Sequence, residues 1–137
     1  MIELTNLKCI HWEDKVHEIR SNIFENRIYI LLKGKLDMEE IRRLSIQVIK
    51  DGRKLYSGFV KITDIRELAP APEEVRLEIQ NMMRSLHDMG MGGAIRIVSP
   101  QGAVTANQFQ RTSRAAGYLA HEVSTPAEAE RILDQMD

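Results

Sequence analysis

The segment that says most about the fold reads Gly58-Phe-Val-Lys-Ile-Thr-Asp-Ile-Arg-Glu-Leu-Ala-Pro-Ala-Pro-Glu-Glu-Val75. It opens with a short run of apolar and β-branched residues that ends on Asp64, which is typical of a buried strand. Two prolines then lead into apolar residues at helical spacing, starting near Glu73. The segment predicts a strand followed by a helix in an α/β protein, with a polar connection at the sheet edge where ligands usually bind.

The size and charge of the chain restrict its class. Its 137 residues match the usual size of one domain with a single core. The 19 basic and 20 acidic residues nearly cancel, so no net field favours nucleic acid, and no nucleic-acid partner is expected. No apolar run approaches the roughly 18 residues of a membrane span. Because the chain shows no signal sequence, the expected location is the cytoplasm.

Strands and helices alternate along the chain after an opening hairpin. Asp37 with Glu40 has the spacing of a capping box, which predicts a helix start there. This alternation predicts an α/β fold with a mixed sheet of about five strands and about four helices, joined by right-handed crossovers. The expected strands cover residues 16–25, 28–33, 59–63, 93–98 and 118–123, and the expected helices cover 38–50, 73–90, 103–116 and 126–136.

One domain accounts for residues 15–137. Residues 1–14 fit no clear element, and three interpretations stay open for them: a flexible arm, an added edge strand, or a segment that contacts a partner. Cys9, the only cysteine, lies in this segment, so neither an internal disulfide nor a cysteine-based zinc site is expected.

Three short motifs, taken with the order of elements, carry a family resemblance. Gly34-Lys-Leu-Asp37 precedes the first helix, Thr63-Asp64 closes the next predicted strand, and Ser124-Thr-Pro-Ala-Glu-Ala129 begins the last helix. Together they resemble the STAS domain, and the likeness over residues 16–136 is nearest to the divergent SpoIIAA-like group. The family includes anti-sigma factor antagonists and the cytoplasmic tails of sulfate transporters. The resemblance implies a SpoIIAA-like fold and a bacterial signalling role through protein partners.

The chain departs from this family at one functional position. In anti-sigma factor antagonists, a serine at the start of the helix after that strand is phosphorylated by a partner kinase. Here no serine, threonine or tyrosine occurs from Asp64 through Arg84, so this switch is not expected. Glu73 and Glu74 place fixed negative charge at the helix start, which is ordinary for a first helical turn.

The candidate binding residues follow from the expected pairing of two strands. If the strands before Asp64 and Ser99 are parallel neighbours, both connections open at the same edge of the sheet. That edge gathers Asp64, Arg66, Glu67, Ser99 and Gln101. A purely structural interpretation is that Asp64 caps its own turn and Arg66 pairs with a nearby carboxylate. The four histidines lack metal-ligand spacing and no nucleophile motif is present, so no catalytic residue, metal or cofactor is expected.

These observations leave three hypotheses about function. The leading one is a non-enzymatic regulatory module that binds a protein partner, of anti-sigma-factor type, through residues 64–73 and the adjoining helix. The second is a carrier that holds an apolar small molecule or lipid between the sheet and helices 75–89 and 103–116, because the latter has few large apolar side chains. The third is an enzyme that uses Asp64 as an acid or base. Homodimerisation is compatible with all three.

Overall fold

The computed structural model describes residues 17–136, which form one five-stranded sheet and four α-helices. The prediction for residues 1–14 lies outside the described residues. The strands are β1 (Glu18–Asn22), β2 (Arg27–Gly34), β3 (Val60–Leu68), β4 (Gly93–Ile97) and β5 (His121–Val123). The helices are α2 (Met38–Gly52), α3 (Glu73–Asp88), α4 (Ala103–Ala116) and α5 (Pro126–Met136), with a short 3₁₀ turn η1 (Pro100–Gly102) before α4.

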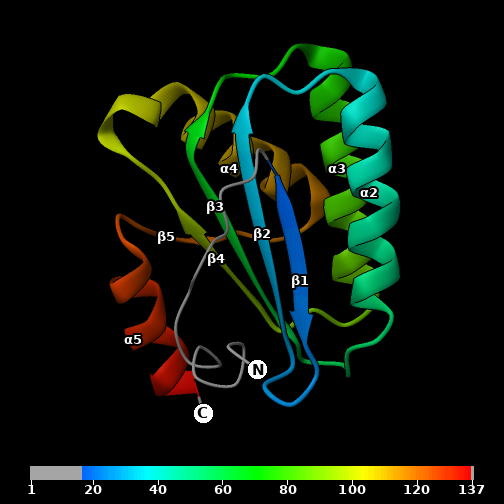
Figure 1. Ribbon diagram of the computed structural model, residues 1–137, viewed down its shortest axis with the longest axis vertical. Coiled ribbons are helices and arrows are strands. Elements are labelled where there is room, and N and C mark those ends of the chain that lie inside the picture. Colours follow the sequence, from blue (N-terminus) through cyan, green and yellow to red (C-terminus); the bar gives the residue numbers. More distant parts are fainter. Residues whose placement is uncertain (1–16, 137) are drawn as a thin grey trace.

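The strands follow one another in space in their chain order, β1-β2-β3-β4-β5. The hairpin strands β1 and β2 are antiparallel, and the remaining neighbours are parallel, which confirms the mixed sheet. Because each parallel strand is added on the same side, right-handed crossovers place α2, α3 and α4 on one face of the sheet. Figure 1 shows these helices together and α5 apart from them, on the opposite face beside β4 and β5.

Strand β3 is longer than predicted. The predicted strand ended near Asp64, but β3 continues to Leu68, so this boundary was wrong. The apolar Ile65 and Leu68 extend the buried side chains past the aspartate, and the end of β2 stays paired with them, since Gly34 is opposite Leu68. Asp64 therefore lies inside a strand and not at its end. In contrast, β5 begins only at His121, three residues later than predicted.

The core has two parts, one on each face of the sheet. The face under α2, α3 and α4 buries alternate residues of each central strand, such as Ile28 and Ile30, against helix residues such as Leu86. The other face buries the intervening residues, such as Tyr29 and Ile62, against α5.

The predicted capping box of α2 is present, because Asp37 Oδ1 accepts from the Glu40 amide and Glu40 Oε1 accepts from the Asp37 amide. No helix within residues 17–136 is long and apolar enough to cross a membrane.

Candidate functional site

Asp64 and Arg66 form a closed ion pair on β3. Asp64 is only 2% exposed, and its Oδ2 accepts from Arg66 Nη2 at 2.7 Å while its Oδ1 accepts from Arg66 Nε at 3.0 Å. The backbone N–H of Arg66 also donates to Oδ1 at 3.1 Å. Bidentate pairs of this kind are among the stronger hydrogen bonds in proteins, and this one raises the pKa of Arg66. Both oxygens of the carboxylate are thus held by one neighbouring residue.

The other three predicted residues surround this pair. Ser99 Oγ donates to the backbone C=O of Arg66 at 3.1 Å, which ties the turn after β4 to β3. Glu67 is mostly exposed, and its Oε2 lies 3.7 Å from Lys33 Nζ on β2. Gln101 is exposed and lines a groove together with Arg66 and Glu67. The structure therefore places the five predicted residues at one end of the sheet, which we name the carboxyl edge because β2, β3 and β4 all end there.

The carboxyl-edge groove has a volume of about 360 Å³. The end of β3 and the start of the following connection form one wall, and η1 with the first turn of α4 forms the other. Exposed apolar surface from Pro70 and Val104 lies beside the polar groups of Glu67 and Gln101. Mixed apolar and polar surface of this kind is suited to contact with another molecule.

The connection between β3 and α3 is held in place by side chains of α3 and α4. Thr105 Oγ1 donates to the C=O of Leu68 at 2.9 Å. The Gln108 side chain accepts from the Ala71 N–H at 2.9 Å and donates to the Ala71 C=O at 3.4 Å. Arg76 Nη1 donates to the same carbonyl at 3.0 Å. The polar residues of α4 are therefore used in part to fix a loop at the carboxyl edge, a role that the sequence did not reveal.

Two basic side chains are buried between the sheet and α4. Lys61 and Arg96 are 2% and 1% exposed, and burial lowers the pKa of both, for Lys61 well below its ordinary value. Lys61 Nζ lies 2.5 Å from Tyr118 Oη, and Arg96 Nη1 donates to Gln110 Oε1 at 3.2 Å. Burial also raises the pKa of Tyr118 to about 12. The sequence signal was a single charged residue inside each of the two predicted apolar strands 59–63 and 93–98, and it was not recognised as the sign of a buried polar site.

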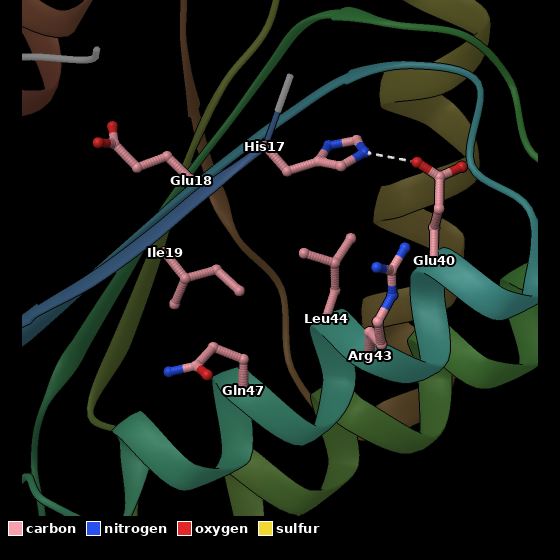
Figure 2. A pocket seen from close by; sticks show the side chains of 7 residues that line it. All are labelled: His17, Glu18, Ile19, Glu40, Arg43, Leu44 and Gln47. Carbon is pink, nitrogen blue, oxygen red and sulfur yellow. Dashed lines mark hydrogen bonds and ion pairs between the residues drawn. The ribbon is translucent and has the colours of Figure 1, made fainter. Parts of the chain in front are cut away.

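A larger groove lies between β1 and α2, with a volume of about 460 Å³. We name it the β1–α2 groove, and its lining residues are His17, Glu18, Ile19, Glu40, Arg43, Leu44 and Gln47. Figure 2 shows Ile19 and Leu44 facing the space between strand and helix, while Glu18 points away from it. Ile19 and Leu44 are partly buried against the core, so the floor of the groove is apolar.

One end of the β1–α2 groove is closed by a pair of side chains. His17 Nε2 lies 3.2 Å from Glu40 Oε2, and Figure 2 shows this contact bridging the strand and the helix. Arg43 also lines the groove and is exposed. Within residues 17–136, no carboxylate forms an ion pair with Arg43. Sequence reasoning did not find this groove, since its residues are ordinary for a strand and a helix and meet only in the folded chain.

The described residues also bear on metal binding. Within residues 17–136, no three His, Cys, Asp or Glu side chains are close enough together to hold a metal ion. The carboxylate at the predicted site is also paired with a guanidinium, which competes with any cation.

Comparison with solved structures identifies the fold as SpoIIAA-like. One similar structure is described as the anti-sigma factor antagonist SpoIIAA in its unphosphorylated form, with a TM-score of 0.58 and 14% identity, covering 85% of this chain and 95% of that one. Another is an uncharacterised DUF3478-family protein with a SpoIIAA-like fold from Shewanella loihica PV-4, with a TM-score of 0.63 and 15% identity, covering 90% and 99%. No protein-family model and no curated protein matches the sequence.

Proposed function

We propose that this chain is a non-enzymatic regulatory module that binds a partner protein at the carboxyl edge. The partner contacts residues 66–73 and the facing turn at residues 99–104. One observation carries the proposal: the connection between β3 and α3 is irregular in backbone conformation, yet two buried side chains of α4 and the half-buried Arg76 of α3 fix it beside a groove with exposed apolar and polar surface. The similarity of the fold to an anti-sigma factor antagonist supports a partner of anti-sigma-factor type.

The fixed connection favours binding because the entropy of ordering a loop is already lost before the partner arrives. Thr105 and Gln108 are 1% and 9% exposed, so their hydrogen bonds to the connection are shielded from water. When a mobile loop binds a partner, the conformational entropy that it loses reduces the binding free energy. This loop is already ordered, so that loss is smaller. The exposed side chains of Glu67, Pro70 and Gln101 then provide the contacts.

The enzyme alternative has less support from the same site. A general base needs a carboxylate oxygen that can reach a substrate proton. Asp64 is almost fully buried and both of its oxygens accept hydrogen bonds from Arg66. The carrier alternative is likewise not favoured by an observation in residues 17–136, because the groove between α3 and α4 is lined mainly by polar side chains such as Gln80 and Arg111.

Charge reversal at the rim of the carboxyl-edge groove tests the proposal. Tagged native protein and the variants Glu67→Arg and Gln101→Arg are used to recover partners from a native cell lysate, and the recovered partner is then purified for direct titration. A matched control is Asp88→Arg, which changes the charge of an exposed residue at the far end of α3. We expect both rim variants to weaken binding about tenfold or more, with the control unchanged.

The proposal is wrong if the purified partner binds the rim variants and the native protein with the same affinity. It is also wrong if Asp88→Arg weakens binding as much as Glu67→Arg, since the effect then follows net charge and not the surface. Circular dichroism of each variant verifies that the fold is retained, and both rim residues are exposed enough for that to be expected.

A further inference from the structure

Strand β1 is an edge strand with a groove along it. Within residues 17–136, β1 pairs with β2 and with no other strand. An edge strand presents backbone N–H and C=O groups along its open side, and an extended segment of another chain can pair with them. Proteins usually cover or blunt such an edge, so an edge that runs beside a groove is a candidate for binding by strand addition.

Backbone pairing alone does not select among side chains of a bound segment. The β1–α2 groove provides that selectivity. Alternate residues of a strand point to the same face, and His17 and Ile19 point toward α2, as Figure 2 shows. A segment added beside β1 places every second side chain over the same groove. Its apolar residues meet Ile19 and Leu44, which form the floor.

The charge of the groove specifies the ligand further. Two carboxylates line the groove: Glu40 lies in contact with His17, and Glu18 points away from the space between strand and helix. Arg43 remains exposed at the rim and pairs with no carboxylate in the described part of the chain. A guanidinium in this position favours a carboxylate on the ligand.

We propose that β1 and α2 form a docking site for an extended acidic and apolar segment of a partner protein. The segment pairs with the edge of β1 that no strand within residues 17–136 occupies, seats apolar side chains on Ile19 and Leu44, and directs a carboxylate to Arg43. This site is separate from the carboxyl-edge groove, which is lined by the end of β3, η1 and α4. Its test is therefore independent of the function proposed above.

The probe is a synthetic seven-residue peptide, acetyl-Thr-Ile-Thr-Glu-Thr-Ile-Thr-amide, in which both isoleucines and the glutamate fall on one face of a strand. Full-length protein labelled with ¹⁵N is titrated with this peptide and its amide signals are followed by NMR. We expect saturable shifts at residues 18–22 and along the groove side of α2. A peptide N-methylated at alternate residues is expected to bind at least about tenfold more weakly, because it cannot complete the backbone pairing.

Charge exchange provides the specific control. Arg43→Glu is expected to weaken binding of the glutamate peptide about tenfold and to strengthen binding of the same peptide with lysine in place of glutamate. Arg42→Glu is the matched control, because Arg42 is exposed on the same helix but does not line the groove. It should leave both affinities unchanged.

Three outcomes overturn the proposal. One is the absence of saturable shifts at millimolar peptide. Another is equal weakening by Arg43→Glu and Arg42→Glu, which indicates attraction by net charge alone. The third is a set of nuclear Overhauser contacts between residues 1–14 and β1 in the free protein, with no peptide binding, which assigns the groove to the chain's own amino-terminal segment.

Discussion

The carboxyl edge and the β1–α2 groove use their charged side chains in opposite ways. At the carboxyl edge, the most conspicuous charges of the sequence, Asp64 and Arg66, face each other in a bidentate pair. In the β1–α2 groove, Arg43 belongs to no motif in the sequence. Its guanidinium nevertheless has no carboxylate partner in residues 17–136. The comparison teaches that a charge is available to a ligand only when the fold has not already paired it.

A second carboxylate, that of Glu130, extends the comparison. Glu130 on α5 lies in the field of Arg27 and Arg20, but neither of its oxygens has a hydrogen-bond partner among residues 17–136, whereas those of Asp64 accept bonds from Arg66. Burial raises the pKa of Glu130 to about 7, and the nearby arginines only partly offset that increase. Proximity to an arginine is therefore not sufficient to stabilise a carboxylate, and the direct hydrogen bonds make the difference.

The largest expected effect is the loss of stability on removing the paired Arg66, compared with removing the unpaired Arg43. Arg66→Ala removes the guanidinium that holds the buried Asp64 carboxylate, so we expect the free energy of unfolding at pH 7 to fall by about 3 kcal/mol. Urea denaturation followed by circular dichroism measures this change. Arg43→Ala is the matched control. A loss below about 0.5 kcal/mol for Arg66→Ala, the value usual for exposed residues, contradicts a structural role for the pair.

The fixed connection at the carboxyl edge gives the next largest effect. Thr105→Val keeps the shape of the side chain but removes the donor to the Leu68 carbonyl, which we expect to cost about 1–2 kcal/mol of unfolding free energy. It should also raise hydrogen exchange at residues 69–72 without altering exchange in β1. Unchanged exchange there means that the side chain does not hold the connection.

The pH dependence of stability tests the raised pKa of Glu130. Because the folded pKa of Glu130 is about 7 and its ordinary value is 4.5, the folded protein holds this proton more tightly than the unfolded chain. The associated stabilisation is complete below pH 4.5 and is lost as the pH rises through 7. Glu130→Gln should lack this loss, and should gain about 1 kcal/mol relative to native protein over that range after allowance for solvent screening.

Chemical denaturation at several pH values within that window measures this difference. The charged neighbours that act on Glu130 must be kept native in both proteins, and they are Arg20, Glu25, Arg27 and Asp134. If the difference between Glu130→Gln and native protein is constant with pH, the raised pKa is contradicted.

The smallest expected effect concerns Arg43 itself. Since its guanidinium is exposed and unpaired in the described part of the chain, Arg43→Ala should change the free energy of unfolding by less than about 0.5 kcal/mol. Thermal denaturation at two salt concentrations is sufficient to measure it. A clear loss of stability that disappears at high salt means that Arg43 has an electrostatic partner in the folded chain, and then the comparison with Arg66 no longer holds.

Local patterns in the sequence were enough to predict the order of elements, the capping box at Asp37 and a mixed sheet, and the parallel pairing of β3 with β4 that the site prediction assumed is present. The end of β3 was not predictable from pattern alone. Asp64 interrupts an apolar run, and its pairing with Arg66 two residues later helps to stabilise a carboxylate buried inside the strand. Lys61 was missed for a related reason, because its burial depends on contact with the distant Tyr118.

The candidate site was also predicted only in part. The five residues predicted at the carboxyl edge do lie at that edge, since parallel strands end together. Which of them are exposed was not predictable, because it depends on the pairing of Asp64 with Arg66. The β1–α2 groove requires residues 17–19 and 40–47 to meet across the fold, and no local pattern encodes that contact.

Hydrogen–deuterium exchange of the full chain, with and without its purified partner, tests binding at the carboxyl edge most directly. We expect slower exchange at residues 66–73 and 99–105 in the complex, with the far end of α3 unchanged. Exchange that is unaltered at both segments while other surfaces become protected contradicts the proposed binding surface.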